Sequence, residues 1–127
     1  MADILLIDDD PALRGTLRKV MERKGHVVRE AEDGERGLRE AGASLPDLVI
    51  TDLLMPEKEG IETIMELQDR WPELPIIAIS GAGGEAGGPL EDAALFGARA
   101  VLSKPFSLDE FLATVDRVLA GGKASGD

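Results

Sequence analysis

The chain of 127 residues contains no cysteine, no tyrosine and a single histidine, His26. The absence of cysteine excludes a disulfide framework and a thiolate metal site, and one histidine cannot build a histidine-rich site. Aromatic residues make up only 3% of the sequence. Any hydrophobic core must therefore be aliphatic.

Basic residues are also scarce: 14 lysines and arginines accompany 25 aspartates and glutamates, for a formal net charge of −11. This balance argues against a nucleic-acid partner, which requires a basic face, and against an anionic membrane surface. No apolar run approaches the roughly 20 residues of a membrane span, and Met1 leads directly into a strand-like run without a basic leader. We therefore expect a cytoplasmic protein with no membrane partner.

Short apolar runs alternate with helical patterns five times along the chain. The expected strands are residues 3–7, 27–28, 48–52, 75–80 and 100–103. The expected helices begin at Pro11 with Asp10 as N-cap, at Asp33 or Gly34, near Ile61, at Pro89, and after the N-cap Ser107. Residues 81–88 include five glycines and are expected to form a flexible loop after the fourth strand.

Continuously apolar strands that alternate with helices predict an α/β fold with a parallel sheet covered on both faces. Right-handed crossovers make this (βα)5 arrangement doubly wound. We expect one domain over residues 1–120 and a disordered C-terminal tail over residues 121–127.

Polar residues end or follow four of the five strands: Asp8 and Asp9 after the first, Asp52 at the third, Ser80 at the fourth and Lys104 after the fifth. In an open parallel sheet, ligands bind at the carboxyl ends of the strands. Carboxylates about 4 Å apart repel each other by about 1 kcal/mol per pair in water and about 4 kcal/mol at an effective dielectric of 20. A hard divalent cation such as Mg²⁺ relieves that repulsion. Lys104 and the Ser80 hydroxyl would complete what phosphoryl transfer onto an aspartate requires.

These residues and their surroundings resemble the receiver domain of two-component response regulators, including the single-domain kind used in chemotaxis. The matching features, in chain order, are Asp8-Asp9, Asp52 with Met55-Pro56 and Gly60, Ser80-Gly81, Gly97-Ala98 and Lys104-Pro105-Phe106. The resemblance covers about residues 3–119. It implies a flavodoxin-like sheet with strand order 2-1-3-4-5.

The resemblance also implies how the acidic residues act. Asp52 would be the phosphorylation site and would accept a phosphoryl group from a phosphohistidine of a sensor histidine kinase or a histidine phosphotransfer protein. Asp9 would bind Mg²⁺ directly and Asp8 mostly through water. Asp52 itself and the backbone carbonyl of Leu54 would complete the protein ligands.

The resemblance assigns Ser80 and Lys104 to the phosphoryl oxygens, with Ser80 moving toward the phosphate on activation and the Lys104–Pro105 bond in the cis form. One position departs from the family, which usually has Tyr, Phe or His three residues before the lysine. Here that position is Val101, which is stiff at χ1 and has no polar tip. We expect the glycine-rich residues 81–88 to carry the signal instead.

The function predicted from these residues is that of a stand-alone receiver that signals by phosphorylation-dependent protein–protein interaction with an unknown downstream target. It would not be an enzyme, because its phosphotransfer and autodephosphorylation are self-catalysed and no external metabolite is turned over. The alternative is a pseudo-receiver, an interaction module that acts without phosphorylation.

Other classes fit the same residues less well. Asp8 and Asp10 could form the Asp-x-Asp pair of a haloacid-dehalogenase-type phosphatase, but the chain is short for one and Asp52 would have no role. An FMN-binding flavodoxin shares the fold but needs phosphate-binding hydroxyls after the first strand, where this chain has acids. The glycines of residues 81–88 lack the order of a P-loop. The plainest alternative is that Asp8 to Asp10 only cap the following helix.

Overall fold

Five strands form one sheet in a computed structural model that describes residues 2–53, 59–80 and 97–121. The strands are β1 (Asp3–Ile7), β2 (Val27–Ala31), β3 (Leu48–Asp52), β4 (Ile76–Ser80) and β5 (Ala100–Ser103). Their order across the sheet is β2-β1-β3-β4-β5, and every neighbouring pair is parallel. The expected α/β fold and strand order are confirmed.

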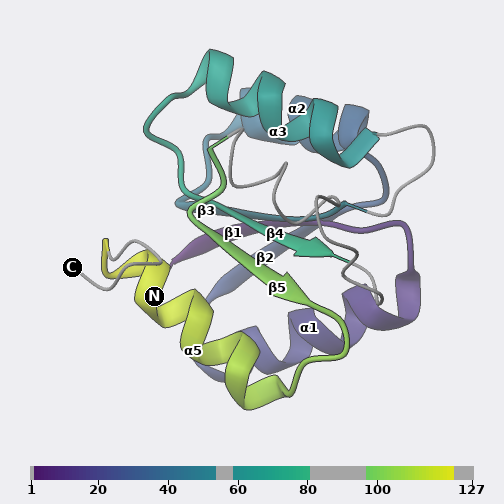
Figure 1. The fold of residues 1–127 in the computed structure, drawn as a ribbon, viewed down its shortest axis with the longest axis vertical. Coiled ribbons are helices and arrows are strands. Elements are labelled where there is room, and N and C mark those ends of the chain that lie inside the picture. Colours follow the sequence, from purple (N-terminus) through teal and green to yellow (C-terminus); the bar gives the residue numbers. More distant parts are fainter. Residues whose placement is uncertain (1, 54–58, 81–96, 122–127) are drawn as a thin grey trace.

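Helices cover both faces of the sheet. The described helices are α1 (Pro11–Arg23), α2 (Gly34–Ala43), α3 (Glu59–Arg70) and α5 (Leu108–Leu119). Helices α1 and α5 lie on one face, and α2 and α3 lie on the other (Figure 1). None of the described helices is long and apolar enough to cross a membrane. The helix expected from Pro89, the glycine-rich residues 81–88 and tail residues 122–127 lie outside the described part of the chain.

The side-chain alternation of the strands separates two cores. Ile4 and Leu6 of β1 belong to the cluster under α1 and α5, whereas Leu5 and Ile7 belong to the cluster under α2 and α3. This follows from the two-residue period of a strand, which sends successive side chains to opposite faces. Among the buried hydrophobic residues of the described segments, Phe111 is the one aromatic. The expectation of an aliphatic core is therefore confirmed.

Three of the predicted helix starts are confirmed by their N-caps. The Asp10 carboxylate accepts hydrogen bonds from the amides of Ala12 at 3.0 Å and Leu13 at 3.3 Å, and so caps α1. Asp33 caps α2 through the Arg36 amide, and Ser107 caps α5. Each cap satisfies backbone donors that the first helical turn leaves without partners.

Two strand boundaries differ from the prediction. Strand β2 continues to Ala31 rather than ending at residue 28, because residues 29–31 pair with residues 5–7 of β1. Its place at the edge of the sheet accommodates charged side chains, which form ion pairs. Arg29 pairs with Asp3 at 3.2 Å, and Glu30 pairs with arginines of α1. Strand β4 begins one residue after Pro75, which has no amide hydrogen to donate to the ladder.

Helix α2 approaches the sheet closely at Gly37. A Cβ added there would clash with Cδ1 of the buried Ile7 and would lie 2.8 Å from its Cγ1. Overpacking at this position should cost about 1–3 kcal/mol. The better helix propensity of alanine offsets about 1 kcal/mol of that cost, and we expect Gly37→Ala to lower the free energy of unfolding.

Urea unfolding measures this change, and Gly42→Ala in the same helix is the matched control. A Cβ at Gly42 has no atom within 4 Å, so this variant should be neutral or more stable. Equal effects of the two substitutions would contradict the close packing at Gly37.

Candidate functional site

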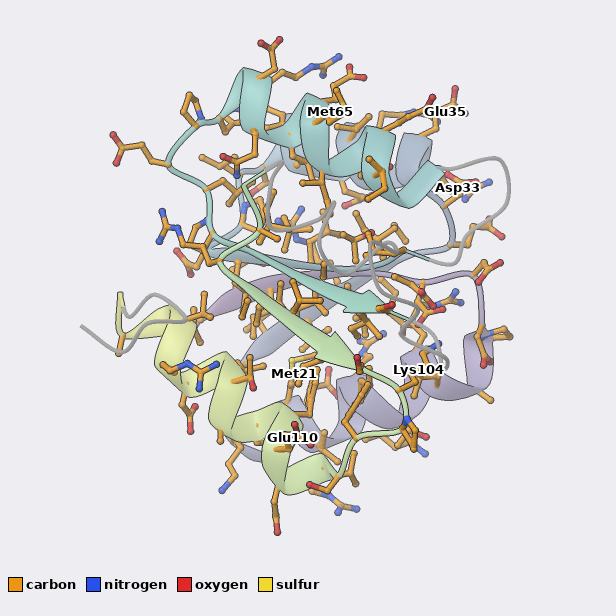
Figure 2. The ribbon with its side chains drawn as sticks, in the orientation of Figure 1. Met21, Asp33, Glu35, Met65, Lys104 and Glu110 are labelled. Carbon is orange, nitrogen blue, oxygen red and sulfur yellow. The ribbon has the colours of Figure 1, made fainter. Side chains whose placement is uncertain are left out.

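The carboxyl edge of the sheet brings distant parts of the chain together. Asp8 directly follows β1, and Asp52 and Ser80 are the last residues of β3 and β4. Lys104 follows β5 and lies near the arrowheads of β4 and β5 (Figure 2). Because β1, β3, β4 and β5 are neighbours in this parallel sheet, their carboxyl ends meet at one place.

Three carboxylates converge at this edge. Asp8, Asp9 and Asp52 each offer one carboxylate oxygen, and these oxygens lie within 4.8 Å of one another. Asp8 and Asp52 are buried, whereas Asp9 is exposed. The remaining predicted ligand, the carbonyl of Leu54, lies outside the described residues.

Asp8 is the most constrained of the three acids. Its Oδ1 accepts a hydrogen bond from the Asp10 amide at 2.8 Å, but its buried Oδ2 has no hydrogen-bond partner among the described residues. Burial, assisted by the nearby Asp52 charge, raises the pKa of Asp8 from 3.8 to about 6 against the lowering effect of the Asp10 hydrogen bond. The buried Oδ2 of Asp8 receives no hydrogen bond from the described residues and lies beside two further carboxylates. Such a group of oxygen ligands suits a hard cation such as Mg²⁺.

Lys104 supplies the positive charge of the site. Its Nζ lies 3.1 Å from Oδ2 of Asp52, and its backbone amide donates to the Ser80 carbonyl at 2.8 Å. The ladder contact places the lysine beside the end of β4, where Ser80 is itself buried. The Lys104–Pro105 peptide bond is cis, as expected.

Sequence reasoning missed one residue beside the site, Arg14 of α1. Its Nη1 donates to the backbone carbonyl of Asp8 at 2.6 Å. In the sequence Arg14 is one polar residue on an amphipathic helix, and no local pattern distinguishes it from Arg18, four residues further along the same helix.

Val101 occupies the position where the family usually has an aromatic residue or histidine. Its half-buried side chain packs against the cluster under α2 and α3.

This fold and its acidic, lysine-paired edge fit a domain that receives a phosphoryl group. The chain belongs to the response regulator receiver domain family, whose family model matches residues 4–116. Proteins of this family act in two-component systems: they receive phosphoryl groups from histidine kinases and bind Mg²⁺ at an acidic pocket. They are phosphoacceptor signalling modules and are generally not classed as enzymes.

Curated relatives support the same assignment. The chain is 41% identical over 114 residues to the KDP operon transcriptional regulatory protein KdpE of Escherichia coli, covering 89% of this chain and 49% of that protein. It is 32% identical over 132 residues to the response regulator MprA of Mycobacterium ulcerans, covering 98% of this chain and 53% of the relative. The chain thus spans about half the length of the curated relatives it matches.

Solved structures agree with the fold. A two-component response regulator of the LuxR family from Aurantimonas sp. SI85-9A1 superposes with a TM-score of 0.88 at 29% identity, covering 97% of this chain and 88% of that one. The chemotaxis response regulator CheY4 of Vibrio cholerae gives a TM-score of 0.83 at 27% identity, covering 93% of this chain and 98% of its own.

Proposed function

We propose that Asp52 is the phosphoacceptor of this receiver and takes its phosphoryl group from a phosphohistidine of a sensor histidine kinase or a histidine phosphotransfer protein. The observation that carries the proposal is the geometry around Asp52. Its carboxylate is buried, lies 3.1 Å from the Lys104 ammonium and shares one edge with the carboxylates of Asp8 and Asp9.

That arrangement supports the following course of the transfer. A carboxylate oxygen of Asp52 bonds to phosphorus while the phosphorus–nitrogen bond to the donor histidine breaks, and the electron pair of that bond stays on the imidazole nitrogen. The Lys104 ammonium then offsets charge on the phosphoryl oxygens, and the Ser80 hydroxyl donates a hydrogen bond to one of them. Bound Mg²⁺ would neutralise charge shared between carboxylates and phosphoryl group.

The metal would be held by the acidic residues of this edge. We propose that Asp9 and Asp52 bind Mg²⁺ directly, that Asp8 acts mostly through water, and that the carbonyl of Leu54 completes the protein ligands. The buried Oδ2 of Asp8, which has no partner among the described residues, supports a cation at this place.

We further propose that the receiver acts as a stand-alone cytoplasmic protein whose phosphorylated form binds a protein target rather than nucleic acid. The net charge of −11 supports a protein target over nucleic acid, because it disfavours contact with a polyanion. The similarity to the chemotaxis response regulator CheY4 supports the stand-alone form as a proposal.

Acetyl phosphate tests the central step. Incubation with acetyl phosphate and Mg²⁺ should add the mass of one phosphoryl group, and hydroxylamine, which cleaves acyl phosphates, should remove it. EDTA should prevent the addition, because the carboxylates then repel the incoming anion. If neither acetyl phosphate nor phosphoramidate labels the folded protein, the pseudo-receiver is the correct assignment.

A further inference from the structure

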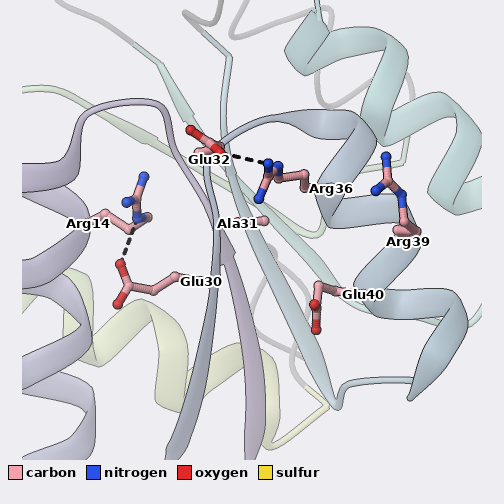
Figure 3. Close-up of a pocket in the computed structure, with 7 residues that line it drawn as sticks. All are labelled: Arg14, Glu30, Ala31, Glu32, Arg36, Arg39 and Glu40. Atoms are coloured by element: carbon pink, nitrogen blue, oxygen red, sulfur yellow. Dashed lines mark hydrogen bonds and ion pairs between the residues drawn. The ribbon is translucent and has the colours of Figure 1, made fainter.

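Arg14 connects the acidic site to the edge strand β2. From the first turns of α1 its guanidinium donates in two directions, from Nη1 to the Asp8 carbonyl at 2.6 Å and from Nε to Oε1 of Glu30 at 2.6 Å. The Arg14 side chain is only 17% exposed, so both bonds are partly shielded from water. Figure 3 shows Arg14 reaching across to Glu30 at a pocket between α1, β2 and α2.

The carbonyl that Arg14 holds belongs to the peptide between two proposed metal ligands, Asp8 and Asp9. The rest of this turn is anchored as well: the Asp8 amide donates to the Ala31 carbonyl at 3.1 Å, and the Asp8 carboxylate accepts from the Asp10 amide. The Arg14 bond fixes the remaining polar group of Asp8's backbone. A rotation of the Asp8–Asp9 peptide would change the separation of the two carboxylates, and the Arg14 bond opposes it.

Glu30 keeps the Arg14 guanidinium in that orientation. Its Oε1 accepts from Arg14, and its Oε2 accepts from Nη1 of Arg18 at 2.6 Å. The hydrogen bonds from Arg18 and Arg14 lower the pKa of Glu30, so the carboxylate stays ionised. Arg18 also pairs with Glu22 at 2.9 Å, which places it at the far end of the network from the acidic site.

We propose that Arg14 is a positioning residue that sets the spacing of the metal-binding acids, with Glu30 as the residue that orients it. The inference rests on the proposed function, since it requires Asp8 and Asp9 to take part in binding Mg²⁺. The direction in which Mg²⁺ affinity changes when Arg14 is replaced tests the proposal. Arg14 is a cation beside a cation site, so on charge alone its removal should tighten Mg²⁺ binding. Loss of positioning should weaken it.

The test is Mg²⁺ titration of the folded protein by calorimetry. Arg14→Met keeps the apolar stem but has no donor, and it should weaken Mg²⁺ affinity about tenfold, as loss of a residue that orients metal ligands typically does. In acetyl phosphate labelling, the Mg²⁺ concentration for half-maximal modification should rise by a similar factor, while the plateau at saturating Mg²⁺ stays near that of the wild type.

Arg18→Met is the matched control. It removes the same charge and the second ion pair of Glu30. The ion pairs of Arg18 in the described part of the chain are with Glu22 and Glu30, so this variant leaves the bond to the Asp8 carbonyl in place. It should lower stability slightly and leave Mg²⁺ affinity unchanged. Arg14→Lys retains the charge but lacks the planar fork, and its affinity should lie between those of wild type and Arg14→Met, which keeps the test open should the Met variant not fold.

The outcomes separate this inference from the proposed function. A wild type that binds no Mg²⁺ would overturn the proposed function and the inference with it. A wild type that binds Mg²⁺, together with Arg14 variants that bind equally or more tightly, would overturn the inference alone. Equal weakening in Arg14→Met and Arg18→Met would assign the effect to the general stability of α1 and also overturn it.

Discussion

Asp52→Asn should reduce labelling by acetyl phosphate and Mg²⁺ to background. The amide that replaces the carboxylate is not a nucleophile, so no acyl phosphate can form. The substitution keeps nearly the same shape, and the amide oxygen can still accept a hydrogen bond from Lys104, whose Nζ lies 3.1 Å from Oδ2 in the wild type. Intact-mass spectrometry measures the labelled fraction, and thermal unfolding checks that the variant is folded.

A second acidic residue provides the matched control for this experiment. Asp47 is exposed, and its Oδ2 accepts from the Asp3 amide at 2.8 Å, at the end of the sheet opposite the acidic site. An Asn side chain can keep that hydrogen bond, so Asp47→Asn should label like the wild type. Labelling of the Asp52→Asn variant at the wild-type level would show that another residue is the acceptor.

Asp8→Asn should make the metal-free protein more stable at neutral pH. In the folded state burial raises the pKa of Asp8 from 3.8 to about 6, so ionising this carboxyl costs more in the fold than in the unfolded chain. At about 1.4 kcal/mol per pKa unit, the penalty above pH 7 reaches up to about 3 kcal/mol. The Asn side chain has no charge to desolvate, and we expect a gain of about 1–3 kcal/mol in EDTA at pH 7.5.

The pH dependence has a defined sign. Because the folded carboxyl binds its proton more tightly, the stability that Asp8 contributes is present below its ordinary pKa of 3.8 and is lost as the pH rises through about 6. The difference between wild type and Asp8→Asn should therefore shrink from pH 7.5 to pH 4. Urea unfolding across this range measures it, and a constant difference would contradict a perturbed Asp8.

Millimolar Mg²⁺ should offset most or all of the stability advantage of Asp8→Asn over the wild type. Binding to the folded state alone stabilises by about 2.7 kcal/mol at a hundredfold excess over Kd, and the wild type should gain this while Asp8→Asn gains little. Asp9→Asn is the control for burial: it removes an equal charge from an exposed side chain. It should gain less stability in EDTA than Asp8→Asn, yet still lose most of the Mg²⁺ effect. No Mg²⁺ effect on the wild type would favour the pseudo-receiver.

Much of the architecture followed from local sequence patterns. The apolar runs ending at Asp52 and Ser80 are strands in the structure, and the caps at Asp10 and Ser107 begin helices where expected. These features depend on neighbouring residues, such as strand hydrophobicity and the hydrogen bond of a cap to the next turn, so they are visible in the chain itself. The proximity of Asp52 and Lys104, 52 positions apart, followed from the rule that the carboxyl ends of parallel strands share one edge. Their direct ion pair is a finding of the structure.

Strand β2 was predicted too short because the prediction used local patterns only. Its charged residues Arg29 and Glu30 break the apolar pattern that identifies a buried strand. They are accommodated because β2 has a neighbour on one side only and its side chains find ionic partners on α1, β1 and α2. These partners lie 11 to 26 positions away in the sequence, so residues 27–31 and their neighbours do not predict them.

The amino-acid sequence was thus enough to predict the fold class, the strand order implied by the family and the residues gathered at the acidic edge. It could not predict that Asp8 is buried and Asp9 exposed, because the two residues are adjacent and chemically identical. The Asp8 amide continues the ladder to the Ala31 carbonyl, which holds Asp8 in the sheet and buries its carboxylate, while Asp9 remains exposed. Nor could it single out Arg14 from Arg18, since both lie on the same helix. Their difference arises from three-dimensional packing, because only Arg14 is close enough to the β1–α1 turn to bond the Asp8 carbonyl.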